Sequence, residues 1–234
     1  MATKIIVSYD GTANDTDALA LGRLLARAGG SLALAYVRHT VESEPGREQL
    51  AQAEAEELLA SGARWLEQPD VPRHVVLSGS TPEGLRELAE REGADAIAFG
   101  SEYRTSPGHV QPGTSAQLLL EGGPIAVAVA PAGFADADPK IDTIAAVGEE
   151  GDPGPRETAA SLAAGLGATV VPRVGAEAGL LVVGSKPGTA AGRVTLSAAA
   201  QYLIEMLGSP VLVLPHGVAL RFGASEPAGP EAGV

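Results

Sequence analysis

The residues best suited to chemistry form a loop that starts at Gly100 and leads into a short predicted helix. Glycines in the loop let backbone N–H groups approach an anion closely, and the free N–H groups of a helix start add partial positive charge. Thr114 and Ser115 follow Gly113 at the end of the loop and add hydroxyl donors. This composition is typical of a phosphate-binding loop.

Four side chains near this loop have two interpretations each. Arg104 and His109 are placed to contact a phosphate, but isolated cations in loops are usually solvated. Tyr103 either fills the pocket or stacks on a base. Asp10, at the end of the first predicted strand, either contacts the ligand or caps a turn or the following helix.

The elements that would position these residues alternate between strand and helix patterns. The expected strands cover residues 5–7, 31–37, 75–77, 96–99 and 125–129, with amphipathic helical segments between them. This alternation predicts an α/β fold with a parallel sheet and helices on both faces. The first and fourth strands then end side by side at the switch point, where ligands bind in such sheets. Asp10 is therefore expected opposite Gly100.

The pattern restarts after Pro131, which indicates an internal repeat. Expected strands cover 141–147, 180–183 and 211–214, with helices through 159–163 and 197–207. We predict a first domain over 1–138, a truncated second domain over 139–222 and a disordered tail over 223–234.

The second unit is shorter between its second and fourth strands. If residues 169–171 form its second strand, residues 172–179 provide 8 residues where residues 38–95 of the first unit provide 58. A parallel connection normally needs a dozen or more. We therefore expect a bare sheet face, and either this face or the final strand should pack on the first unit.

Composition and charge exclude several classes of protein. Aromatic residues make up 3% of the chain, which disfavours a β-sandwich, and the net charge of −13 disfavours nucleic acid as a partner. There is no cysteine, and the four histidines share no metal-ligand spacing, so no metal site is recognisable. The first apolar strand is too short for a signal peptide or a membrane span, so we expect no membrane association and a cytoplasmic location.

Residues 3–131 resemble the universal stress protein (UspA) family. The shared segments are Val-x-x-Asp-Gly-Thr at the first strand, Ala-Glu-Glu-Leu-Leu, Gly-Ser-Thr-Pro-Glu and Gly-Ala-Asp-Ala-Ile-Ala-Phe-Gly-Ser. The resemblance implies two adenine nucleotide alpha hydrolase-like (Rossmann-like) domains, the second truncated. ATP-binding members share Gly, two residues, Gly, nine residues, Gly and then Ser or Thr. This spacing falls on Gly100, Tyr103, Gly113 and Thr114.

By this resemblance the cofactor is ATP or AMP, with Asp10 beside the adenosine and the Val37 backbone beside the adenine. The resulting set of nucleotide-binding residues is Asp10, Val37, Gly100, Tyr103, Arg104, Gly113, Thr114 and Ser115. The same count from Gly184 reaches Pro187, Ser197 and Ala198, so the second unit is expected to be degenerate.

Family members commonly dimerise through their last strand. A tandem chain can make that pairing internally, between residues 125–129 and 211–214, which also covers two exposed sheet edges. The expected partners are thus an adenine nucleotide and the other half of the chain, as an internal pseudo-dimer. The sequence leaves open whether two chains form a homodimer.

Three functions follow from the sequence. The first is a stress-response sensor or regulator that binds an adenine nucleotide through its first domain. The second is a nucleotide-free interaction or dimerisation module of the same fold. The third is slow ATP hydrolysis, the most we expect of an enzyme, because no Walker-type loop, Gly-x-Gly-x-x-Gly turn or Gly-x-Ser-x-Gly elbow is present.

Overall fold

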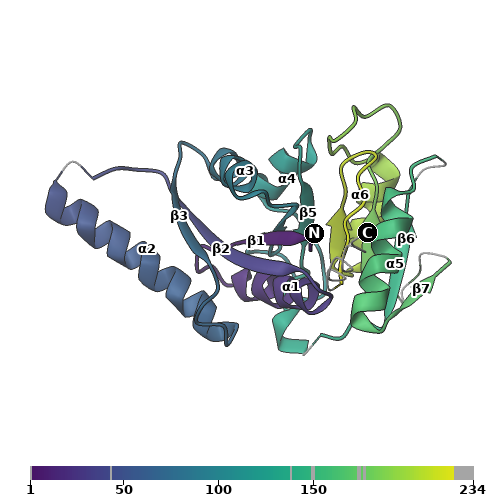
Figure 1. Ribbon diagram of the computed structural model, residues 1–234, viewed down its shortest axis with the longest axis horizontal. Helices are drawn as coiled ribbons and strands as arrows, with labels where there is room; N and C mark the ends of the chain where they lie inside the picture. Colours follow the sequence, from purple (N-terminus) through teal and green to yellow (C-terminus); the bar gives the residue numbers. More distant parts are fainter. Residues whose placement is uncertain are drawn as a thin grey trace, which may run out of the picture.

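All nine strands of the described chain lie in one sheet (Figure 1). The computed structural model describes residues 2–42, 44–137, 139–148, 151–172, 175 and 178–223. The strand order is β3-β2-β1-β4-β5-β9-β8-β6-β7, and every neighbouring pair is parallel except β5 and β9. The predicted α/β class is confirmed.

The helices and strands follow the predicted alternation closely. In chain order they are β1 Lys4–Ser8, α1 Asp15–Arg27, β2 Ser31–Arg38, α2 Pro45–Trp65, β3 Arg73–Leu77, α3 Thr81–Glu92, β4 Ala96–Phe99, α4 Thr114–Leu120, β5 Ala126–Val129, the 3-10 turn η1 Ala135–Ala137, β6 Thr143–Val147, α5 Gly154–Leu166, β7 Thr169–Val171, β8 Leu180–Val183, α6 Ala198–Leu207 and β9 Val211–Val213.

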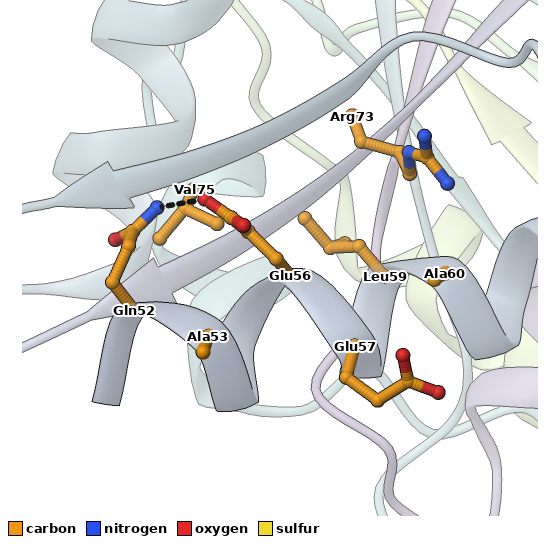
Figure 2. Close-up of a pocket in the computed structure, with 8 residues that line it drawn as sticks. All are labelled: Gln52, Ala53, Glu56, Glu57, Leu59, Ala60, Arg73 and Val75. Carbon is orange, nitrogen blue, oxygen red and sulfur yellow. Dashed lines mark hydrogen bonds between the residues drawn. The ribbon is translucent and has the colours of Figure 1, made fainter. Parts of the chain in front are cut away.

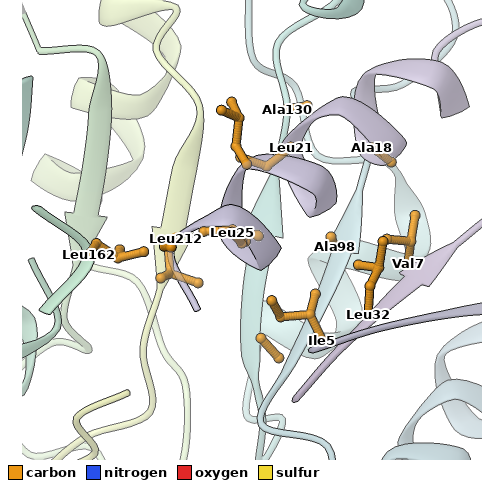
Figure 3. Close-up of a cluster of buried hydrophobic side chains, with 14 of the residues drawn as sticks. Ile5, Val7, Ala18, Leu21, Leu25, Leu32, Ala98, Ala130, Leu162 and Leu212 are labelled. Carbon is orange, nitrogen blue, oxygen red and sulfur yellow. The ribbon is translucent and has the colours of Figure 1, made fainter. Parts of the chain in front are cut away.

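The central strands are buried on both faces, as a parallel sheet between helices requires. In β4, Ala96 and Ala98 point to one face while Ile97 and Phe99 point to the other. The first face packs against α1, α2 and α5, and the second against α3, α4 and α6. Figure 3 shows the first cluster, where leucines of α1 lie over the sheet beside Leu162 of α5.

The antiparallel pairing of β5 with β9 joins the two units of the repeat. Val127 pairs with Val213 and Val129 with Val211, and these side chains are at most 1% exposed. The last strands of the two units therefore meet as predicted, and both hydrophobic clusters continue from one unit into the other.

The second unit has the expected truncated topology. Its strands run in the order β7-β6-β8-β9, which matches β2-β1-β4-β5, and no strand equivalent to β3 occurs among its described residues. One helix covers each face, α5 on one and α6 on the other. The expectation of a bare sheet face is therefore wrong, and the uncovered part of this unit is the edge strand β7, where Val170 is 41% exposed. Residues 173, 174, 176 and 177 of the β7–β8 connection lie outside the described residues.

Two further segments tie the units together. The Asp17 carboxylate of α1 accepts hydrogen bonds from the N–H groups of Gly133 (2.9 Å) and Ala135 (2.7 Å) in the linker after β5. Near the C-terminus, the Arg221 carbonyl accepts bonds from the N–H and hydroxyl of Thr3, next to β1. The linker and the end of the second unit are therefore held against the first unit.

The predicted domain boundary at 138–139 falls between η1 and β6, and residue 138 lies outside the described residues. The same holds for residues 224–234 of the predicted tail, whereas Gly223 packs beside Gly29. Within the described residues, no helix combines the length and the apolarity needed to cross a membrane.

Close packing of α5 on α1 gives a test of the joined core. A Cβ at Gly165 would collide with the Ala28 carbonyl, so Gly165→Ala should lower the free energy of unfolding by about 1–3 kcal/mol. The same change at Gly46, in the first turn of α2, meets open space and should raise it by about 0.5 kcal/mol. Urea unfolding of the two variants measures both effects, and equal effects at both positions would contradict this packing.

Candidate functional site

A pocket of about 310 Å³ lies at the carboxyl ends of β1 and β4, at the predicted switch point. Segments after β1 and β4 and the starts of α3 and α4 line it. The lining residues are Ser8, Asp10, Thr12, Asp15, Thr81, Phe99, Gly100, Ser101, Glu102, Tyr103, Gly113, Thr114, Ser115 and Ala116.

Six of the eight predicted site residues line this pocket, namely Asp10, Gly100, Tyr103, Gly113, Thr114 and Ser115. Val37 and Arg104 do not. The Val37 side chain is 7% exposed and belongs to the hydrophobic cluster beneath α3. The structure thus assembles the loop and Asp10 as expected, but it does not place Val37 at the pocket wall.

The two glycines of the predicted motif, Gly100 and Gly113, differ in the space around the position that a Cβ would occupy. At Gly100 a Cβ would collide with the Asn14 carbonyl, so the close approach of α1 to the end of β4 already requires glycine. At Gly113 a Cβ would meet no atom within 4 Å. Packing within the chain therefore does not require glycine at position 113, where the backbone borders the pocket.

The loop between β4 and α4 is held by hydrogen bonds at its start. The Ser101 hydroxyl donates to the Ala130 carbonyl (2.7 Å) and accepts from the Gln111 N–H (3.1 Å). The Asn14 side chain donates to the carbonyls of Ser101 (3.1 Å) and Glu102 (2.9 Å). These bonds fix the pocket wall to both β5 and α1.

The middle of the loop is held by the linker and by the second unit. The Gly108 N–H donates to Ala132 (2.8 Å), and the Ala132 N–H donates to His109 (3.0 Å). Gly208, after α6, lies so close to the Gly108 carbonyl that a Cβ there would collide with it. Contacts with both units therefore hold the middle of the loop in position.

The second unit repeats the hydrogen bonds of the Ser101 hydroxyl at Ser185. The Ser185 hydroxyl donates to Leu214 (2.8 Å) and accepts from the Thr195 N–H (3.2 Å), with the same residue separations as at Ser101. At its switch point, however, a Cβ on Gly184 would lie 2.7 Å from the Pro155 ring. Pro155 thus packs against the end of β8, as Asn14 packs against Gly100 at the end of β4. The degeneracy of the second unit stays a prediction.

Tyr103 stands at the rim of the pocket rather than inside it. Its side chain is 60% exposed, and the Arg104 guanidinium lies 4.9 Å from the centre of its ring. The filling of the pocket by Tyr103, one of the two sequence interpretations, is therefore wrong. Arg104 stacks on this ring instead of lining the pocket.

Asp15 is the main charged group of the pocket that sequence reasoning missed. Its carboxylate accepts hydrogen bonds from the N–H groups of Asp10 (2.5 Å), Gly11 (2.7 Å) and Thr12 (3.2 Å). Burial and the neighbouring Asp10 carboxylate raise the pKa of Asp15 to about 7. The backbone amides of the β1–α1 turn are thereby already occupied by a side chain of the protein.

The pocket is rich in oxygen atoms and acidic. Three carboxylic acids line it, Asp10, Asp15 and Glu102, and its lining includes no lysine, arginine or histidine. The hydroxyls of Ser8, Thr12 and Thr81 were also missed, since single hydroxyl residues carry no spacing signal. Within the described residues no group of three His, Cys, Asp or Glu side chains is placed to hold a metal ion.

A second and wider pocket of about 540 Å³ lies between α2 and the edge strand β3 (Figure 2). Glu56 accepts a hydrogen bond from Gln52 (2.8 Å), and Arg73 projects from β3 on the other side. This pocket lies away from the switch point and its lining contains no glycine. It therefore does not compete with the switch-point pocket as the predicted site.

Comparison with known proteins gives a family match and a fold match. The model of the universal stress protein family matches residues 1–131. A crystal structure of a functionally unknown protein from Pseudomonas aeruginosa PAO1 has a TM-score of 0.60 at 16% identity, covering 92% of this chain and 93% of that one. A universal stress protein from Archaeoglobus fulgidus DSM 4304 has a TM-score of 0.55 at 15% identity, with coverages of 91% and 98%. The comparison with curated proteins found no match.

The raised pKa of Asp15 predicts a pH dependence of stability. Because the carboxyl ionises at a lower pH in the unfolded chain, its contribution to the free energy of unfolding falls as pH rises from about 4 to about 7. The fall is about 1.4 kcal/mol for each pKa unit between the two states. Asp15→Asn should remove this component from urea unfolding measured across that range, whereas the exposed Asp70→Asn should keep it. If Asp15→Asn kept the pH dependence of the wild-type free energy of unfolding, that dependence could not be assigned to Asp15.

Proposed function

The chain belongs to the universal stress protein family, and we propose that its first unit binds an adenine nucleotide in the pocket between β1 and β4. The protein would act as a stress-linked sensor or regulator rather than as an enzyme. This proposal rests on the position of Gly113. A Cβ on this residue would meet no protein atom within 4 Å, so the pocket has space for a ligand beside the Gly113 backbone.

The nucleoside part of such a ligand fits the chemistry of the pocket. Ribose hydroxyls and the adenine amino group are hydrogen-bond donors, and the carboxylates of Asp10 and Glu102 are acceptors. The volume of about 310 Å³ is at the lower end of the usual range for small-molecule sites. Tyr103, exposed at the rim, offers a ring on which a base can stack.

The phosphate part of such a ligand would find both hydrogen-bond donors and repelling carboxylates in the pocket. The hydroxyls of Thr114 and Ser115 and the backbone at Gly113 supply neutral donors, as the family motif implies. Asp10 and Glu102 repel each added phosphate charge, and no cation of the lining offsets them. We therefore propose that AMP binds more tightly than ATP.

The acidic lining also favours a second function. A pocket with three carboxylic acids and no basic side chain suits a nucleotide-free module whose output is partner binding or dimerisation. In that case the braced loops would serve only to hold the two units together. ATP hydrolysis remains the third proposal, and phosphate release that Gly113→Arg abolishes would support it.

Calorimetric titration of the full chain distinguishes the first two functions. AMP should bind with a stoichiometry of one and more tightly than ATP, because it carries fewer charges into the acidic pocket. Gly113→Leu, which fills the open space, should weaken AMP binding at least about tenfold, a loss of about 1.4 kcal/mol. Gly46→Leu, on the distant α2, should leave it unchanged. Absence of heat with either nucleotide at millimolar concentration would reject nucleotide binding and favour the interaction module.

Protonation of Asp15 should couple AMP binding to pH. As pH falls from about 8 to about 7, loss of charge at Asp15 should strengthen binding, because one fewer carboxylate repels the phosphate. Titrations of the wild type and of Asp15→Asn at the two pH values isolate this component from titration of the nucleotide itself. Identical pH dependences in both proteins would show that Asp15 does not contribute.

A further inference from the structure

A third pocket lies at the opposite end of the first unit's sheet and is formed by both units. It has a volume of about 390 Å³ and sits before the first residues of β4 and β5. Arg86 and Glu90 of α3 line it from the first unit, and Arg193 lines it from the second. Two guanidinium groups from distant parts of the chain therefore border one cavity.

The antiparallel pairing of β5 and β9 explains why these arginines line the same pocket. It places the carboxyl end of the second unit's strands beside the amino end of the first unit's strands. The loop after β8, which carries Arg193, thus comes to the turn before β5, and the Val194 N–H donates to the Gly123 carbonyl (2.9 Å). No helix equivalent to α3 occurs among the described residues of the second unit, so this arrangement occurs once.

Hydrogen bonds of its backbone N–H and carbonyl hold Arg193 in position. Its carbonyl accepts hydrogen bonds from the Ser185 hydroxyl (3.0 Å) and the His216 N–H (2.8 Å), and its N–H donates to Ala190 (3.1 Å). The guanidinium itself donates one bond, to the Gly122 carbonyl (3.3 Å). Most of its donors consequently remain available to a ligand.

Arg86 has no partner within the described chain. It forms no hydrogen bond or ion pair there, although acidic residues outnumber basic ones by 29 to 16 in the sequence. Arg86, Ala89 and Glu90 share one stripe of α3, since residues three and four positions apart face the same side of a helix. The half-buried Arg86 side chain thus borders the pocket without forming an ion pair, although Glu90 lines the same pocket.

We propose that this pocket binds a small organic anion, with a phosphate or carboxylate group held between Arg86 and Arg193. Guanidinium groups bind such oxygens in a bidentate manner, and these bonds are stronger than those between neutral groups. Ala89, Pro124 and Ile125 give the same pocket an apolar wall, which suits a ligand with an apolar body beside its charged group. Glu90 lowers the positive charge of the site and limits its affinity.

Phenyl phosphate is the probe for this site because it combines both features. Calorimetric titration of the full chain at constant ionic strength should give one site that binds phenyl phosphate more tightly than inorganic phosphate. Arg86→Gln and Arg193→Gln should each weaken binding about tenfold or more, since each removes charge-assisted hydrogen bonds. Glu90→Gln should strengthen it. Arg91→Gln, on the same helix but paired with Glu92, should have no effect.

Two controls separate this site from the switch-point pocket and from misfolding. Gly113→Leu should leave phenyl phosphate binding intact, so the test stands even if the first pocket binds no nucleotide. Thermal unfolding without ligand should be alike in all the arginine variants. Absence of binding, or equal binding by the wild type and both pocket-arginine variants, would overturn the proposal, because general attraction to cations does not depend on these two positions.

Discussion

The antiparallel contact between β5 and β9 is the interaction on which the rest of the structure depends. Three residue pairs join the last strands of the two units, and the valines at its ends are at most 1% exposed. Without it each unit would present an open edge of unpaired backbone groups, and the truncated second unit would have little core of its own. With it, one sheet and two continuous hydrophobic clusters span the whole described chain.

The pockets at the two ends of the first unit differ in the charges that line them. At the carboxyl end, three carboxylic acids line the switch-point pocket. At the amino end, the β5–β9 contact brings Arg193 of the second unit to the pocket that Arg86 and Glu90 line. In a chain of net charge −13 such a separation depends on topology rather than on composition. The second unit therefore has two contacts with functional parts of the first. It packs against the loop between β4 and α4, and it completes the pocket before β4 and β5.

Much of the candidate site could be predicted because strand alternation determines which chain segments meet. Asp10 and Gly100 follow two strands that parallel topology makes neighbours, and both line the pocket. Asp15 was missed because its importance comes from a turn that folds its carboxylate back onto preceding N–H groups. Arg104 was expected at the pocket, yet its contact with the ring of Tyr103 turns it away, and no sequence pattern reports such stacking.

The sequence by itself determined the order of strands and helices, the internal repeat and the shortening of the second unit. These follow from apolar periodicity and chain connectivity, which are local properties. Only the tertiary structure decided that Pro155 packs against Gly184, that Asn14 requires glycine at position 100, and that Arg86 and Arg193 line one pocket. The physical reason is that these contacts join residues far apart in the chain, whose approach depends on helix packing and on the relative direction of the two units.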